Sequence, residues 1–472
     1  MRKDFDTVLR STLQHALEYL HQVDAKPVGP TTSLAELRNR MARTWDSEPR
    51  DSRQVIDELV QDIEGGLNNS ASARFYAWVI GGSIPSALAA DWLTSTWDQN
   101  AGMYSVSPAA AVAEEVVGAW LKDLFRLPPA TSFALTTGCQ VANTTCLAAA
   151  RSWLLKKRGW DVERLGMPGS PAITVFCGER HATIDRALRL LGMGDASLKA
   201  LATDPQGRLD SSALDTALSE LNGGPAIVLL QAGDINTGTF DNFEELIPIA
   251  RAHDAWTHVD GAFGMWVVAS PHFEHLVRGI EDAHSWATDG HKWLNVPYDC
   301  GYAFVAEPAA HRDSMSFHAS YLNHQDQARD PVDWNPELSR RARGFPSYAA
   351  LRELGRDGVR EIVERDCECA AGIVRGLSQF EEVEVLARPI INQGLVAFLG
   401  PDGKADDKWN DRVITEIAKE GTSFFSGTTW HGRRAMRISV TNWQTSGDDV
   451  ERTLAGVQRA LRKAYPAKIS VP

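Results

Sequence analysis

The chain has 472 residues, of which 43% are apolar and 23% are charged, and its formal net charge is −13. This composition is typical of an ordinary folded protein, and the length predicts two or three lobes around more than one core. The negative charge argues against nucleic acid as a partner, because phosphate binding needs clustered lysines and arginines.

Neither a membrane nor a secretory route is predicted for the chain. No apolar run approaches the roughly 20 residues of a membrane span. The first segment, MRKDFDTVLR, carries acids where a signal peptide would turn apolar. The six cysteines form no CxxC pair and show no zinc-ligand spacing. We therefore expect reduced thiols, no metal site and a cytoplasmic protein.

A first helix is expected over residues 4 to 23, where apolar side chains from Val8 to Val23 recur at helical spacing. Pro27 and Pro30 end this pattern, so the helix is expected to stand apart from the main core. Its apolar stripe packs either on a second subunit or elsewhere on its own chain, and the residues leave both open. We assign residues 1–100 to an N-terminal helical segment and expect it to contact a second subunit.

From about residue 130 the chain alternates strand-like and helix-like runs. This alternation predicts an α/β domain with a largely parallel sheet and a ligand site at the carboxyl ends of its strands. We assign residues 101–345 to this large domain. The strand candidates are residues 132–137, 171–177, 225–233, 255–260 and 300–307.

Residues 346–472 are predicted to form a smaller α+β domain. A helical stretch is expected from Pro346 to about Leu377, and a closing helix from about Asp449 to Tyr465. Between them, VEVLA, GLVAFLG and AMRISV have the composition of short strands.

The most informative pair of residues is Asp260, in WTHVDGAFG, and Lys292, in ATDGHKWLN. A pyridoxal phosphate enzyme needs a lysine amine that holds the cofactor aldehyde as a Schiff base. It also needs a carboxylate that pairs with the ring nitrogen and keeps it protonated. The pair therefore predicts pyridoxal 5′-phosphate as the cofactor.

Three other positions just past predicted strands fit such a site. Gly138, Cys139 and Gln140 open a helix, and free backbone N–H groups at a helix N-terminus favour a phosphate, although an ordinary strand-to-helix turn looks the same. His181 stands where a strand gives way to a helix and could stack on a cofactor ring or simply cap the helix. Ala262 is small enough to let a flat ring lie over it.

The order and spacing of these motifs resemble the group II pyridoxal phosphate decarboxylases, which include the aromatic amino acid and glutamate decarboxylases. The resemblance implies fold type I, with a mainly parallel seven-stranded sheet flanked by helices, and it implies a homodimer. The motifs are RFYAWVIGGSIPSALAADWL, TGCQVAN, His181, AGDINTGTFD, HVDGAF, DGHKW, SYL at 320–322, LSRR at 338–341 and GTTWHGRRAMRIS.

The resemblance also implies roles for single residues. Lys292 is similar to the Schiff-base lysine, Asp260 to the pyridinium partner, and His181 to the ring that stacks on the cofactor. Tyr321 matches the tyrosine that protonates the α-carbon after carbon dioxide leaves. The cofactor-binding set implied in this way is Gly138, Cys139, Gln140, His181, Asp260, Ala262, Asp289, His291 and Lys292.

One cofactor position departs from the family pattern. The aromatic amino acid enzymes carry asparagine where this chain has Asp289. A carboxylate near a phosphate is repulsive unless it is protonated, turned away or bridged. The phosphate contacts at this position are therefore expected to differ.

The residues expected at the substrate are Tyr76, Trp78, Asn100 and Arg437. Asn100 stands where the aromatic enzymes place a large apolar side chain, so an aromatic substrate is not favoured. Arg437 matches a family arginine near the site entrance and could hold a carboxylate, while a structural ion pair explains it equally well.

We therefore expect decarboxylation of an L-amino acid to an amine and carbon dioxide. The alternatives on the same cofactor are an aldehyde-forming oxidative decarboxylase, an aminotransferase or a lyase, and a remote one is a non-catalytic binding protein. Aldehyde-forming relatives tend to replace the loop tyrosine or the stacking histidine, and this chain keeps both Tyr321 and His181. The identity of the amino acid is not predicted.

Overall fold

The computed structural model describes residues 5–45, 47–316 and 328–465. At its centre is a seven-stranded sheet whose strand order is β2-β8-β7-β6-β5-β3-β4. Only β8 runs antiparallel to its neighbours, so the predicted mainly parallel seven-stranded sheet is confirmed. The strands are β2 (Ser132–Thr136), β3 (Thr174–Cys177), β4 (Leu198–Ala200), β5 (Ala226–Gln231), β6 (Trp256–Asp260), β7 (Ser285–Asp289) and β8 (Gly301–Val305).

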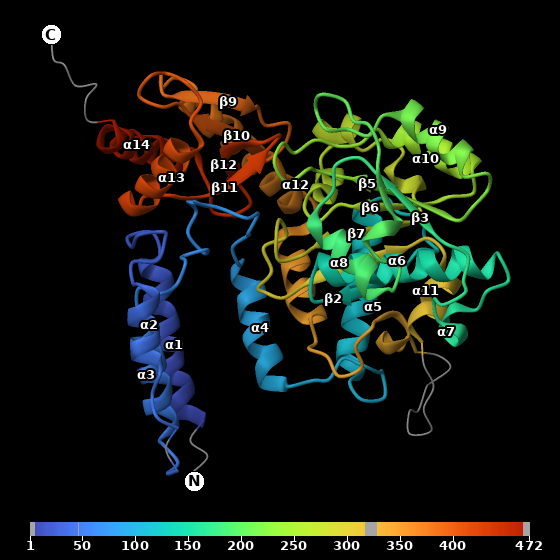
Figure 1. Ribbon diagram of the computed structural model, residues 1–472. Helices are drawn as coiled ribbons and strands as arrows, with labels where there is room; N and C mark the ends of the chain where they lie inside the picture. The colour runs from blue at the N-terminus through green and yellow to red at the C-terminus, as the bar shows by residue number, and fades with distance from the viewer. Residues whose placement is uncertain (1–4, 46, 317–327, 466–472) are drawn as a thin grey trace.

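Helices cover both faces of this sheet, and each face has its own apolar core (Figure 1). Alternate residues of a strand point to opposite faces, so Val259 of β6 joins one core while Trp256 joins the other. One face is covered by α6 (Cys139–Lys156), α8 (Ala182–Leu190) and α11 (Pro308–Met315), with the short α7 (Val162–Leu165) beside them. The other is covered by α5 (Pro108–Leu124), α9 (Ser211–Glu220), α10 (Phe243–Ala252) and part of α12 (Gly344–Leu377).

A smaller five-stranded sheet, in the order β1-β11-β12-β10-β9, forms the C-terminal lobe (Figure 1). The expected strands and closing helix are present, and β11 was not predicted. An unexpected member is β1, which comes from the N-terminal region and pairs Phe75 with Phe424. The elements are β1 (Phe75–Tyr76), β9 (Val383–Ala387), β10 (Gln393–Phe398), β11 (Phe424–Trp430), β12 (Arg433–Ser439), α13 (Asp407–Glu420) and α14 (Gly447–Ala464).

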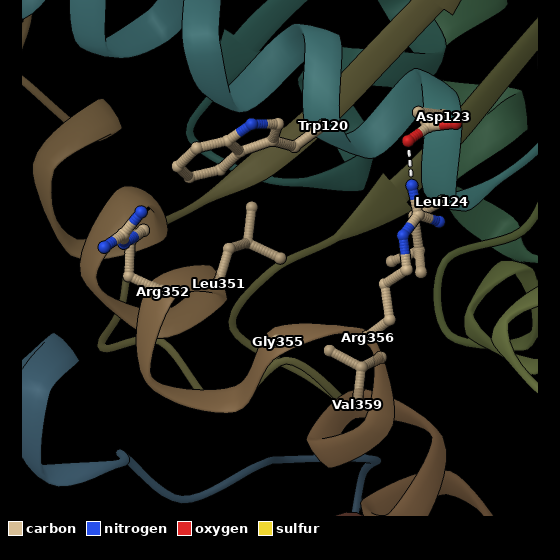
Figure 2. A pocket seen from close by; sticks show the side chains of 8 residues that line it. All are labelled: Trp120, Asp123, Leu124, Leu351, Arg352, Gly355, Arg356 and Val359. Carbon is tan, nitrogen blue, oxygen red and sulfur yellow. Dashed lines mark hydrogen bonds and ion pairs between the residues drawn. The ribbon is translucent and has the colours of Figure 1, made fainter.

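Helix α12 joins the two lobes and bends at Gly355, whose φ of 59° lies in the left-handed region. Figure 2 shows the groove beside this bend, where Trp120 and Leu124 of α5 face Leu351 and Val359 of α12. Its volume is about 450 Å³. The groove shares no lining residue with the cavity described in the next section.

Three N-terminal helices, α1 (Phe5–Gln22), α2 (Leu34–Met41) and α3 (Ser52–Ile63), stand beside the two lobes, whereas α4 (Pro85–Trp97) packs on α12 (Figure 1). The predicted first helix is α1, and none of its described residues is buried. Its stripe of Leu9, Leu13, Leu17 and Leu20 is 38 to 53% exposed. The stripe is therefore only about half covered within a single chain.

None of the described helices is long and apolar enough to cross a membrane. Within the described residues, no group of His, Cys, Asp and Glu side chains is arranged to hold a metal ion.

Candidate cofactor site

A cavity of about 270 Å³ opens at the carboxyl ends of β6 and β7, next to the start of α6. All nine residues that the sequence assigned to the cofactor lie on its wall. Phe263, Thr183 and the loop that contains Gly233 were not predicted. The lining residues are Gly138, Cys139, Gln140, His181, Thr183, Gln231, Gly233, Ile235, Asp260, Ala262, Phe263, Asp289, His291 and Lys292.

Lys292 follows β7 and reaches into this cavity. Its Nζ lies 3.2 Å from Oδ2 of Asp289 and 5.7 Å from the centre of the Phe263 ring. A Cβ atom at Gly81 would meet the backbone oxygen of Lys292 at 2.0 Å, so only a glycine lets the two segments approach. The N-terminal region thus holds the lysine backbone in place.

Asp260 ends β6 at one end of the cavity and is 9% exposed. Its Oδ2 accepts a hydrogen bond from Nδ2 of Asn143 at 3.2 Å. Its Oδ1 accepts from the backbone N–H of Ala262 at 3.3 Å and from Sγ of Cys139 at 3.5 Å. Burial and the neighbouring Asp260 raise the pKa of the Cys139 thiol, which therefore stays protonated and donates.

Asp289 ends β7 and lies against the first turn of α6, where Cys139 contacts both this carboxylate and Asp260. Oδ1 of Asp289 accepts the backbone N–H of Cys139 at 2.6 Å and lies 3.5 Å from Nε2 of His291. Nδ1 of His291 accepts the N–H of Cys300 at 3.1 Å, and burial lowers the pKa of this ring. In the neutral ring the proton is therefore on Nε2, which points toward Asp289.

Gly138 precedes α6 and keeps the space at this turn open. A Cβ atom there would lie 3.1 Å from Cε1 of His291 and 3.4 Å from Oδ1 of Asp289, inside the space above the helix N-terminus. Helix N-termini favour anions because their first N–H groups lack partners within the helix. Oδ1 of Asp289 accepts the backbone N–H of Cys139 and faces Nε2 of His291, so a phosphate above this helix N-terminus would share those donors with the carboxylate.

His181 is the N-cap of α8 and stands on the cavity wall. Its Nδ1 accepts from the backbone N–H of Thr183 at 3.4 Å and lies 2.8 Å from the Thr183 hydroxyl. Burial lowers the pKa of His181. A neutral ring with its proton on Nε2 is the form that these contacts favour.

Gln140 donates from Nε2 to the backbone oxygen of Thr183 at 3.1 Å, and its Oε1 is buried without a hydrogen-bond partner among the described residues. Together the amine, the buried carboxylate, the ring of His181 and the N-terminal cradle match the groups of pyridoxal 5′-phosphate. The amine matches the aldehyde, the carboxylate the ring nitrogen, and the cradle the phosphate. The residues present thus fit this cofactor.

The structure corrects one substrate prediction. Tyr76 is fully buried in the core of the C-terminal lobe, and its hydroxyl lies 3.2 Å from Oγ1 of Thr453. Its ring cannot reach a substrate, because the short β1 strand inserts it into the smaller sheet. Trp78 is 48% exposed beside Phe424, and neither it nor Asn100 lines the cavity.

Arg437 of β12 is 6% exposed and is not among the residues that line the cavity. Burial lowers the pKa of its guanidinium to about 10, against an opposing effect of Asp234, and the charge of Arg437 helps to lower the pKa of His181. Within the described part of the chain, Nε of Arg437 has no hydrogen-bond partner. Tyr321, the predicted proton donor, lies outside the described residues.

Sequence reasoning also missed Asn143, the hydrogen-bond donor to Asp260. It stands four residues after Cys139 on the same helix, so both side chains project from one face of α6. That spacing was the signal available in the sequence.

Known proteins with similar sequences span most of this chain. The aromatic-L-amino-acid decarboxylase of Bacillus atrophaeus is 23% identical, over 92% of this chain and 90% of its own. The 4-hydroxyphenylacetaldehyde synthase of Rhodiola rosea is 24% identical, over 90% of this chain and 88% of its own.

Solved structures share the fold over nearly the whole length. Oryza sativa TDC with PLP and tryptamine superposes with a TM-score of 0.89 at 21% identity and covers 98% of both chains. Mouse CSAD gives a TM-score of 0.89 at 19% identity and covers 96% of this chain and 98% of its own. The predicted fold type I of pyridoxal phosphate enzymes is confirmed.

A family model adds the reaction class to this fold. The model of the pyridoxal-dependent decarboxylase conserved domain matches residues 35–399. Because that match covers most of the chain, the chain belongs to the pyridoxal-dependent decarboxylase family and is a carboxy-lyase that uses pyridoxal 5′-phosphate.

Proposed function

We propose that the chain decarboxylates an L-amino acid to its amine in the cavity between β6, β7 and α6. The observation that carries this proposal is the meeting of Lys292, Asp260 and His181 on the wall of one cavity beside a helix N-terminus. The groove between α5 and α12 is a poorer candidate for the cofactor, because its described lining contains neither a lysine for a Schiff base nor a histidine.

The proposed roles follow from the position of each side chain. Bound pyridoxal 5′-phosphate supplies an electron sink for the bond that breaks at the α-carbon. Lys292 holds the cofactor aldehyde, and Asp260, kept in place by three donors, holds the ring nitrogen in its protonated form. Gly138, Cys139, Gln140 and His291 surround the phosphate.

His181 stacks on the cofactor ring in this proposal, and Ala262 lies on the opposite face. Thr183 occupies Nδ1 of His181. The Nε2–H group of His181 therefore points away from Thr183 and can donate to a substrate oxygen. Tyr321 protonates the α-carbon after carbon dioxide leaves, a role that rests on the sequence alone. Arg437 binds a carboxylate, which is supported by its burial and its unpartnered Nε within the described chain.

An aldehyde product is the second candidate, because some relatives are aldehyde synthases by name. Formation of the amine requires proton delivery to the α-carbon, and the chain retains both Tyr321 and His181 for that purpose. We therefore favour the amine.

The test is to incubate the purified enzyme, loaded with pyridoxal 5′-phosphate, with each of the common L-amino acids. Mass spectrometry then measures amine, aldehyde and carbon dioxide. One amino acid, or a small group, should give equal amounts of amine and carbon dioxide, and Lys292→Ala should give neither. Aldehyde with ammonia and peroxide would establish the second candidate, and no product from any amino acid would refute both.

A homodimer is also part of the proposal. The Leu9 to Leu20 stripe of α1 is about half exposed in one chain, and a helix with one apolar face is stabilised when that face is covered. A second copy that covers this stripe could bring Trp78 and Asn100 toward a substrate. Sedimentation should give about twice the chain mass of 51.8 kDa, and Leu13→Asp with Leu17→Asp should give the monomer.

We also propose a cellular location and a division of the chain into domains. All six cysteines are free and buried, which supports a reducing compartment such as the cytoplasm. We retain the division into residues 1–100, 101–345 and 346–472, with β1 as an N-terminal strand that completes the C-terminal sheet.

A further inference from the structure

A chain of buried polar side chains leads from the core of the large domain to Asp260. Indole Nε1 of Trp256 donates to Oγ of Ser285 at 2.9 Å, and that hydroxyl lies 2.8 Å from Nδ1 of His258. Nε2 of His258 lies 2.9 Å from Oδ1 of Asn143, whose Nδ2 donates to Asp260 at 3.2 Å. The other four members of this series are fully buried: Trp256, Ser285, His258 and Asn143.

The fold explains why these side chains meet. Trp256, His258 and Asp260 alternate along β6 and so project from the same face of the sheet. His258 pairs in register with Ser285 of the neighbouring β7. Helix α6 packs on this face and contributes Asn143.

The proton of each hydrogen bond in this series can be assigned to a donor. The amide of Asn143 must turn its nitrogen toward Asp260, because its oxygen would be repelled by the carboxylate. Its oxygen therefore faces His258, which must donate from Nε2. Burial lowers the pKa of His258 to about 4, so the ring is neutral and its Nδ1 accepts from the hydroxyl of Ser285.

The hydroxyl of Ser285 in turn accepts from the indole of Trp256, which can only donate. Every donor thus points toward the carboxylate. Hydrogen bonds aligned in one direction polarise one another in a low-dielectric interior.

We propose that His258 and Asn143 are positioning residues that hold Asp260 oriented toward the ring nitrogen of the cofactor, an inference that rests on the proposed role of Asp260. Neither residue touches the cofactor cavity, so both act through the carboxylate. The relay is Trp256, Ser285, His258, Asn143 and Asp260.

The test compares two cofactors that differ only at the ring nitrogen. Apoenzyme is titrated with pyridoxal 5′-phosphate and with its deaza analogue, in which a carbon atom replaces the ring nitrogen, and quenching of tryptophan fluorescence gives each Kd. His258→Leu should weaken binding of pyridoxal 5′-phosphate by up to about tenfold, because Asn143 loses the donor that fixes its amide, and its own hydrogen bond to the charged Asp260 is then weakened. Binding of the analogue should stay unchanged, since it has no nitrogen for Asp260 to pair with.

Two further variants separate positioning from packing. His258→Gln can donate to Asn143 and accept from Ser285, so it should restore most of the affinity for pyridoxal 5′-phosphate. Thr145→Val is the matched control, because Thr145 is a buried residue of α6 whose hydroxyl donates to the backbone oxygen of Val141 in the same helix. It should leave both Kd values unchanged.

The outcomes distinguish this inference from the proposed function. Equal weakening of both compounds by His258→Leu, or no weakening of either, would overturn the relay while the role of Asp260 stands. Wild-type protein that bound the two compounds equally well would overturn the role of Asp260 and the relay with it.

Discussion

The two ends of the cofactor cavity each carry a buried aspartate, and their surroundings are opposite. Asp260, at the ring-nitrogen end, receives three hydrogen bonds and has no cation within ion-pair distance among the described residues. Asp289, at the phosphate end, receives the N–H of Cys139 and lies 3.2 Å from the amine of Lys292. In the proposed cofactor site, the first carboxylate faces the cationic ring nitrogen and the second lies beside the anionic phosphate.

This difference shows that burial and charge alone do not define a role. At the ring-nitrogen end the protein supplies donors that stabilise a negative charge, and the cofactor supplies the matching positive charge. In the same proposal the phosphate lies beside Asp289, which accepts the helix N-terminal N–H group of Cys139 that a phosphate also needs. The proposed ring-nitrogen site is thus complementary to its ligand, and the proposed phosphate site is less so.

The largest expected effect comes from removing the charge at the ring-nitrogen end. Asp260→Asn should lower kcat about a thousandfold, because the ring nitrogen loses the charge that keeps it protonated and the electron sink fails. Steady-state decarboxylation with the best substrate of the panel measures it. The same substitution at Asp289 is the matched control and should leave kcat within a few-fold. Similar losses in both variants would remove the contrast between the two ends.

The next effect is on stability in acid. The pKa of His258 is lowered by burial to about 4, so the folded state resists a proton that the unfolded state accepts below about pH 6.5. The His258 contribution to the free energy of unfolding is therefore fully present above this pH and is lost as the pH drops toward 4. From these values the His258 contribution at pH 5 is a loss of about 2 kcal/mol.

Urea unfolding of the apoenzyme at pH 7.5 and pH 5 checks this sign and size. His258→Gln cannot titrate, so it should lose about 2 kcal/mol less than the wild type between the two conditions. The other histidines whose pKa burial lowers are present in both proteins and cancel in the comparison; they are His181, His284, His291 and His311. An equal acid loss in both proteins would show that His258 is not kept neutral by the fold.

At the phosphate end the expected change has the opposite direction. Asp289→Asn should tighten binding of pyridoxal 5′-phosphate about tenfold, because it removes a negative charge next to the phosphate. Binding of pyridoxal, which has no phosphate, should change much less. Fluorescence titration of the apoenzyme with both compounds measures this difference. Weaker binding of pyridoxal 5′-phosphate in the variant would mean that the carboxylate assists the phosphate, for instance through His291.

The sequence predicted the cofactor wall well, because those residues lie in short motifs at the ends of strands. Every member of that set, from Gly138 to Lys292, lines one cavity. Tyr76 was misplaced, since a motif gives the position of a residue in the chain and not the direction of its side chain. The two-residue strand β1 inserts that ring into the other lobe.

Other features depended on contacts between distant segments. Strand β7 was missed because SWATD is short and polar, and only its place between β6 and β8 makes it a strand. The relay depends on the register of His258 with Ser285 and on the packing of α6 above them. The apolar stripe of α1 was visible in the sequence, and its exposure in one chain was not.

The smallest expected effect tests the space at the phosphate end. The backbone of Gly138 is extended, so alanine is tolerated conformationally, but its Cβ would lie 3.1 Å from Cε1 of His291. The ring must then shift by a few tenths of an ångström, and we expect pyridoxal 5′-phosphate to bind about threefold more weakly. Gly447→Ala is the control, because a Cβ there meets no atom within 4 Å. Unchanged affinity in Gly138→Ala would mean that the phosphate does not lie in the cradle between Gly138 and His291.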